Sequence, residues 1–284
     1  IDGHLRNRDG SLKADAQLIM SDRDGVTGYG AVFDALYAAS PSLRHKFEVD
    51  IMDEDVDFND LGFLLRNDYA KARYVLMYNK QDVSALLSNY RTTLVLKHQH
   101  NLSENQITDS AILWRSSIVL PGRNTLRAGI GYFPERYEDI NSRGNGAYRV
   151  NGGGWFEGYL STDAAKTVSF TFGLGGNEED LGDWSYNGVV GLTSLPVDQI
   201  SIAFDLSYRD RSGWVVHQGG RNFGVFDADE WQPSLDVNWF IAPGHQLRWN
   251  MQWAGVRATD EGFFAIPQGD GDLIAATRAQ DNYD

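Results

Sequence analysis

The densest group of carboxylates in the sequence is the string DEDVDFND, which contains Asp53, Glu54, Asp55, Asp57 and Asp60. Its D-x-D-x-D start is how a calcium-binding loop begins, and carboxylate oxygens are ligands that Ca²⁺ prefers. Phe58 stands where such a loop needs glycine, and Leu64 stands where it needs a bidentate glutamate. A Ca²⁺ or Mg²⁺ site at Asp53, Asp55 and Asp57 is therefore a hypothesis, and a solvated acidic loop is the interpretation we favour.

Two sets of histidines could also do chemistry. His98 and His100 share one face of any strand that contains them, which suits a metal ion, but no neighbouring ligand completes the site. The string RDRSGWVVHQGG combines Asp210, Ser212 and His217, the residue types of a hydrolase triad. Proximity in sequence does not give triad geometry, and a structured loop explains the string equally well. We therefore predict no catalytic residue.

Composition narrows the class of protein that must position these residues. The chain has 284 residues, no cysteine and a formal net charge of -14. The absence of cysteine excludes disulfides and thiol chemistry, and the acidic balance argues against a nucleic-acid partner. Mean hydropathy is -0.39, and no stretch approaches the roughly 18 apolar residues of a membrane-spanning helix. No signal peptide is visible at the start of the sequence.

Alternation of apolar and polar residues with a period of two dominates the chain and predicts β-strands. In VSFTFGL the apolar residues Val168, Phe170 and Phe172 alternate with small or polar ones, and QLRWNMQW repeats the pattern from Leu247 to Trp253. About thirteen segments of this kind follow one another, roughly 9 to 11 residues long where the pattern is clean. The pattern is weakest at 108–120, where Arg115 breaks the alternation, and at 152–160.

The expected connections alternate in length. Short turns are predicted at 40–43, 121–124, 194–199 and 242–246. Long loops are predicted at 53–71, 134–153, 175–183, 209–231 and after 255. Short turns at one end, long loops at the other and aromatic residues near strand ends are typical of an outer-membrane barrel. A soluble sandwich, propeller or solenoid is the alternative, but average soluble strands are shorter, at roughly 5 to 6 residues.

We therefore predict an all-β fold, a transmembrane antiparallel up-and-down β-barrel. Residues 1–284 would form a single barrel domain that is incomplete and truncated at both ends, since single-chain bacterial barrels usually have an even number of strands. Apolar side chains would face lipid, and a set of charged side chains would line the interior: Lys13, Asp15, Lys46, Glu48, Asp50, Arg127, Asp205, Arg209 and Arg248.

Several strings that periodicity does not explain resemble a bacterial family known as domain of unknown function 5916. They are ADAQLIMSDRDG (14–25), DFNDLGFLLRND (57–68), YFPERYEDINSRGNG (132–146), LSYRDRSGWVVHQGGRNF (206–223) and WQP (231–233). The resemblance covers most of the chain. It implies a barrel-like region that follows a signal peptide and a carbohydrate-binding module related to family 9. Members are often labelled as membrane-associated hydrolases, but the resemblance transfers no catalytic residue to this chain.

These observations predict a non-enzymatic barrel in the bacterial outer membrane, acting as a pore, a transporter or a membrane platform, with a link to glycan handling. The alternatives are a membrane-associated hydrolase acting on a glycan or lipid, and a structural anchor for a partner protein. The expected partners are outer-membrane lipid, lipopolysaccharide, and an oligosaccharide or periplasmic protein. No cofactor is expected beyond Ca²⁺ or Mg²⁺ at the acidic loops, where divalent ions would bridge to lipopolysaccharide.

Overall fold

The computed structural model of the chain describes residues 1–57, 66–85 and 87–277 and consists almost entirely of β-strands. The one helical element in this described part is a short 3₁₀ turn, η1 (Pro121–Arg123). None of the described residues form a helix long and apolar enough to cross a membrane. The strands are β1 (Asp2–Arg6), β2 (Leu12–Arg23), β3 (Val26–Ala38), β4 (Leu43–Met52), β5 (Tyr69–Ser84), β6 (Leu87–Asn101), β7 (Ile107–Val119), β8 (Thr125–Phe133), β9 (Arg136–Glu138), β10 (Tyr148–Val150), β11 (Gly153–Ser161), β12 (Val168–Glu178), β13 (Trp184–Val197), β14 (Ile200–Gly219), β15 (Asn222–Ala242), β16 (His245–Gln252), β17 (Gly255–Ala265) and β18 (Ile274–Ala276).

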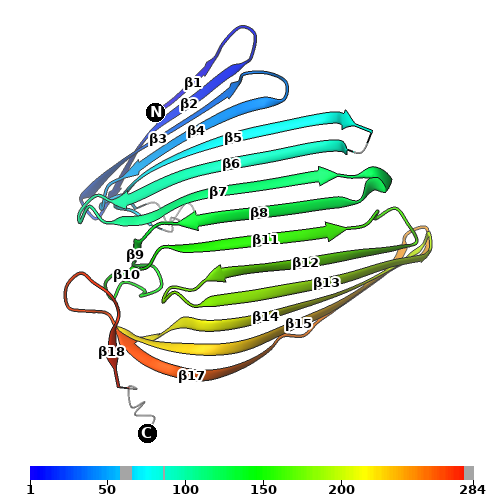
Figure 1. Cartoon of the computed structure of the whole chain (residues 1–284). Helices are drawn as coiled ribbons and strands as arrows, with labels where there is room; N and C mark the ends of the chain where they lie inside the picture. Colours follow the sequence, from blue (N-terminus) through cyan, green and yellow to red (C-terminus); the bar gives the residue numbers. More distant parts are fainter. Residues whose placement is uncertain (58–65, 86, 278–284) are drawn as a thin grey trace.

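Sixteen of these strands form one antiparallel sheet in which neighbours in sequence pair with each other. One exception is β8, which pairs with β11 because β9 and β10 form a separate hairpin, and another is β17, which pairs with β15. β16 and β17 both pair with β15 and together cover its length. Figure 1 shows the sheet as a curved wall that runs from β1 to β17. Among the described strands β1 does not pair with β17 or β18, so this wall is open.

The two ends of the sheet differ as the sequence predicts. At one end short turns join β3 to β4, β7 to β8, β13 to β14 and β15 to β16. At the other end the chain makes its longer connections, including 53–68 (of which 58–65 lie outside the described residues) and 134–152, although the turns from β2 to β3 and from β14 to β15 at this end are also short. The all-β antiparallel fold is therefore confirmed, whereas the described strands do not close into a barrel.

Four details of the prediction are wrong. The sheet has more than thirteen strands, because β1, at five residues, and β18, at three, are too short to show a period. The segment 209–231 is mostly strand, since β14 and β15 continue to a tight turn at 220–221, and β17 lies after residue 255. These extensions carry polar residues on both faces, so the alternation is lost there. Arg115 follows the alternation of β7 rather than breaking it, since it contacts Glu157 on the charged face.

The sheet has one apolar and one polar face. Residues directly opposite each other on paired strands share a face. One such row joins His4, Asp15, Asp34, Glu48, Arg73 and Lys97 on six successive strands. The opposite face exposes large apolar side chains along the sheet, among them Leu18, Phe33, Phe47, Ile112, Ile130, Phe172, Val190, Phe204 and Trp249. We call these the polar face and the apolar face.

Candidate functional site

The strand register places all nine predicted interior side chains on the polar face. Asp15 and Glu48 belong to the charged row, and Arg127 lies opposite Ser117 and Tyr159. Several of the nine are ion-paired: Lys46 Nζ lies 2.6 Å from Glu48 Oε1, and Lys71 Nζ lies 2.9 Å from Asp50 Oδ2. The members are Lys13, Asp15, Lys46, Glu48, Asp50, Arg127, Asp205, Arg209 and Arg248. Their role in lining a pore stays a prediction.

A cavity of about 540 Å³ lies on this face between β8, β11, β12, β13 and β14. This volume falls in the range of about 300–1,000 Å³ that is usual for small-molecule sites. Its walls combine aromatic rings, amides, carboxylates and two guanidinium groups, with glycines between them. The lining residues include Asp109, Phe133, Arg136, Gly153, Gly154, Trp155, Glu157, Tyr159, Asn177, Glu179, Asp180, Asn187 and Arg209.

A second cavity of about 380 Å³ adjoins the first, since Asp109 and Arg136 line both. Its floor is the polar face of β5, β6 and β7, and its other wall is the hairpin of β9 and β10 with the turn that follows β9. The hairpin thus lies over the polar face at the long-loop end (Figure 1). The two cavities form one polar region beneath it.

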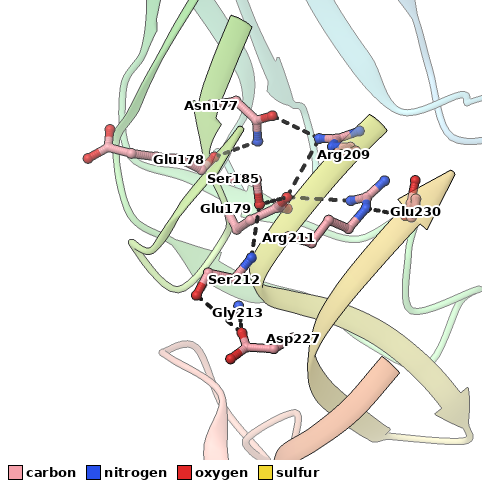
Figure 2. Close-up of polar contacts among 10 residues, drawn as sticks. All are labelled: Asn177, Glu178, Glu179, Ser185, Arg209, Arg211, Ser212, Gly213, Asp227 and Glu230. Carbon is pink, nitrogen blue, oxygen red and sulfur yellow. Dashed lines mark hydrogen bonds and ion pairs between the residues drawn. The ribbon is translucent and has the colours of Figure 1, made fainter. Parts of the chain in front are cut away.

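Glu179 is the centre of a partly buried polar cluster beside the first cavity (Figure 2). Its Oε1 accepts a hydrogen bond from Ser185 Oγ at 2.6 Å and lies 3.4 Å from Arg211 Nη1 and 3.6 Å from Arg209 Nη2. Arg209 also donates to Asn177 Oδ1 at 2.8 Å. We call these residues, with Glu230 on the far side of Arg211, the Glu179 cluster. It fixes Arg209 in the cavity wall.

Below this cluster β14 bends at Gly213, which has φ of +73° in a bulge between Arg211 and Trp214. A side chain here would also approach Asp183, whose Oδ2 lies 2.9 Å from the position of an added Cβ. The bulge turns the Ser212 hydroxyl and the Gly213 N–H onto Asp227 Oδ1, each at 3.1 Å. Glycine is needed because other residues avoid this backbone conformation.

The triad considered from the sequence is not assembled. Ser212 Oγ bonds to Asp227, whereas His217 Nε2 contacts the backbone oxygen of Gly220 at 2.8 Å. Asp210 lies opposite Tyr186 and Asp229 in the ladder. His98 and His100 do lie together, with ring centroids 5.8 Å apart, and His98 Nδ1 contacts Ser110 Oγ.

The acidic loop is organised by its own backbone. Asp53 Oδ1 accepts hydrogen bonds from the N–H groups of Asp55 and Val56, and Asp53 Oδ2 accepts one from Tyr29. Asp57 pairs with Arg23. No group of three or more metal-ligating side chains occurs among residues 1–57, 66–85 and 87–277, and Asp60, Phe58 and Leu64 lie outside them. The divalent-ion hypothesis for Asp53, Asp55 and Asp57 stays a prediction.

A small hydrophobic core closes the long-loop end. Tyr148 and Val150 of β10, Phe223 of β15, Ile266 and Leu273 pack together, and Tyr148 is fully buried. Arg149 links the segment that contains β10 to the segment after β17 through a bidentate pair with Asp272, at 2.8 and 2.9 Å. We call the segments 134–152 and 266–276, joined in this way, the cover.

Two carboxyls at the cover have pKa values that are shifted in opposite directions: Asp180 beside it and Asp272 within it. Burial raises the pKa of Asp180 above the ordinary range, although Arg136 lies 3.2 Å away and opposes the shift. The hydrogen bonds from Arg149 lower the pKa of the exposed Asp272. Asp180 therefore takes up a proton more readily than an ordinary carboxyl, whereas Asp272 holds its charge more firmly.

Sequence reasoning did not select the cavity residues Trp155, Tyr159, Asn177, Asn187 or Glu179. One local signal was available. Glycines stand directly opposite the large side chains across the strands: Gly131 opposite Trp155 and Gly173 opposite Tyr159. A Cβ at Gly131 would lie 2.3 Å from Trp155 Nε1, so the glycines make room for the rings.

The fold and this face define a class, an all-β protein built on one large antiparallel sheet with an apolar and a charged face. Within that class, the family model described as "Domain of unknown function (DUF5916)" matches residues 1–284, and the chain belongs to this family. The resemblance expected from the sequence is thereby confirmed. No curated protein matches the chain.

Proposed function

We propose that this chain forms the wall of a transmembrane β-barrel in the bacterial outer membrane, and that the barrel is a pore or transporter for polar solutes. The observation that carries the proposal is the apolar face, which exposes large hydrophobic side chains on strand after strand. Exposed apolar patches of ordinary soluble proteins rarely exceed a few hundred Å². A surface of this kind needs lipid or protein against it.

The height of the apolar face fits a bilayer. On β14 the outward side chains are apolar from Ile200 to Tyr208, and the next outward residue is Asp210. Nine residues at about 3.3 Å each cover about 30 Å, and a strand tilt of about 40° reduces this to roughly 23 Å. Outer-membrane barrels have an apolar band of about 25 Å. On β15 the same band runs from Trp231 to Trp239, directly opposite.

Membrane insertion sets a condition on the sheet edges. Unpaired backbone groups in hydrocarbon cost several kcal/mol each, so a spanning sheet must close. The barrel that we propose therefore contains strands that pair with β1 and with β16–β17, whichever chain supplies them. The long-loop end would face lipopolysaccharide, where divalent ions could bridge to the acidic loop, and the short turns would face periplasmic partners.

A solute path is favoured over a passive anchor because the polar face carries charges of both signs and two adjoining cavities at the long-loop end. Rings of charged and amide side chains are what select solutes in pores. The cover would lie across the mouth of the barrel and restrict access to this path.

Two neighbouring valines on β13 provide a matched test of insertion. Val190 lies on the apolar face and Val189 on the polar face. An arginine near the middle of a lipid-facing band costs about 2–4 kcal/mol, whereas one in a wet interior does not. We expect Val190→Arg to reduce insertion of the full-length protein into liposomes, and Val189→Arg to leave it unchanged. Equal insertion of the two variants would contradict the membrane proposal.

Single-channel recording then separates a pore from an anchor. The full-length protein in a planar bilayer should give steady current that polar solutes reduce. Inserted, heat-modifiable protein that carries no current would contradict the open pore and favour an anchor or a closed transporter.

A further inference from the structure

The cavity on the polar face contains hydrogen-bonding groups that the protein does not use. Within the part of the chain that the structure describes, the Asn187 amide, the Tyr159 hydroxyl and the Trp155 indole N–H form no hydrogen bond. Arg209 Nε is buried without a partner, although Arg209 Nη2 is bound to Asn177. Buried polar groups are normally paired, and leaving one unpaired costs about 1–3 kcal/mol. Only Arg209 Nε is buried in this way, whereas the polar groups of Asn187, Tyr159 and Trp155 are accessible from the cavity. Together the four groups suit a ligand that both donates and accepts hydrogen bonds.

Aromatic rings form the apolar part of the same wall. The Trp155 ring lies against Gly129 and Gly131, and the Tyr159 ring lies against Gly173, where an added Cβ would be 2.4 Å from the ring. Because the glycines have no side chains, the rings lie along the sheet. One side of Trp155 carries the Arg115 guanidinium, whose Cζ is 4.8 Å from the ring centroid. These rings provide flat apolar surfaces next to the unused polar groups.

Charge determines the class of ligand. Five carboxylates line the cavity (Asp109, Glu157, Glu178, Glu179 and Asp180), against two guanidinium groups, Arg136 and Arg209. Most of these charges are already paired: Asp109 with Lys97, Glu157 with Arg115, and Asp180 with Arg136. The excess of carboxylates repels an anion, and apart from Arg209 Nε the unused groups are neutral. The ligand must therefore form hydrogen bonds, lie against aromatic rings and carry no negative charge. An uncharged ligand with an apolar ring face and several hydroxyls meets these three conditions.

We propose that this cavity binds a neutral sugar ring, with Asn187, Tyr159 and Arg209 bonding its hydroxyls and Trp155 contacting its C–H face. Sugar access from the membrane side rests on the proposed function, but the binding chemistry does not. The inference names the solute class that the polar face would accept.

The test uses the full-length protein in detergent micelles. Maltose, cellobiose and N,N′-diacetylchitobiose are titrated while tryptophan fluorescence and saturation-transfer NMR are recorded, with digalacturonate as the anionic counterpart. We expect saturable binding of at least one neutral disaccharide and at least tenfold weaker binding of digalacturonate. Loss of one hydrogen bond is worth about tenfold in affinity, so Asn187→Ala and Tyr159→Phe should each weaken binding by about this factor.

Asn238→Ala is the matched control, because Asn238 lies on the polar face of β15 outside the cavity. It should leave the affinity unchanged. The proposal is overturned if folded protein binds none of the three sugars, if digalacturonate binds as tightly, or if the Asn238 variant loses affinity as much as the Asn187 variant. If the protein inserts into membranes but binds no sugar, only the sugar-site proposal is contradicted. If it binds sugar but does not insert, only the membrane proposal is contradicted.

Discussion

The polar face has two charged regions built from the same residue types, and they differ in what lies over them. In the row on β2 to β6, Glu48 is 17% exposed and pairs with Lys46 and Arg73, whose side chains are each 37% exposed. In the Glu179 cluster, Glu179 and Arg211 are 12% and 16% exposed. Ion pairs in water contribute little to stability, whereas an ion that loses its partner in a shielded place is costly. The two regions therefore differ mainly in how far their cations are shielded from solvent, and not in residue type.

The largest effect should come from removing the packing that closes the long-loop end. Phe223 is 1% exposed and its ring lies 5.1 Å from that of Tyr148. Phe223→Ala should cost about 3–4 kcal/mol because it leaves a cavity in a small core. Hydrogen exchange of the β10 amides measures this opening. Phe223→Leu, which keeps most of the volume, should cost less than about 1.5 kcal/mol, and equal losses would show that the cover is held by its ion pairs instead.

The next effect should come from the shielded carboxylate. Glu179→Gln keeps the shape of the side chain but removes the charge that Arg209 and Arg211 face. We expect the free energy of unfolding in guanidinium chloride to fall by about 2–3 kcal/mol, below the full cost of breaking a deeply buried pair because some solvent reaches the cluster.

The matched change in the open row should have a smaller effect. Glu48→Gln removes the negative charge with which Lys46 and Arg73 pair, and solvent still reaches both of these cations. We expect a loss of about 1 kcal/mol or less in the same unfolding measurement, and less still at high salt. If this variant lost as much stability as the Glu179 variant, shielding would not be the difference between the two regions.

The smallest effect is a pH dependence with opposite signs at the cover. Asp180 has a folded pKa raised by burial, so its proton binds more tightly in the folded state. It favours folding at low pH, and this contribution is lost as pH rises above its ordinary value of 3.8 and through the folded pKa. Asp272, with a lowered folded pKa, contributes stability above 3.8 that is lost as pH falls through the folded pKa.

The asparagine variants measure these two contributions. In the native protein, the raised pKa of Asp180 should increase the guanidinium chloride midpoint of unfolding as pH falls from neutral toward 4. Asp180→Asn should remove this increase. Asp272→Asn should keep that increase but remove part of the loss below pH 4. A native pH profile that both variants leave unchanged would contradict the pKa directions of both groups.

The sequence could predict which face each strand residue occupies because alternation is local: Glu48 and Arg209 need only their neighbours to be placed. It could not predict the cavity. Arg136 and Asp180, which line the cavity, are 44 residues apart, and Gln106 and Asp270, which tie the cover to the sheet, are 164 apart, so no periodicity relates them. Strand ends were also missed, since β14 and β15 extend past the apolar band, where polar and apolar residues no longer alternate regularly.

The cover has a consequence for the order of folding. The hairpin of β14 and β15 closes at residues 220–221 and needs only local chain contacts. The cover needs Arg149 to meet Asp272 across 123 residues and Gln106 to meet Asp270 across 164. Closing such long loops costs less entropy once the strands between the contacting residues have already paired. We therefore expect the cover to assemble last, so that solvent protection of Tyr148 would report that the whole wall has formed.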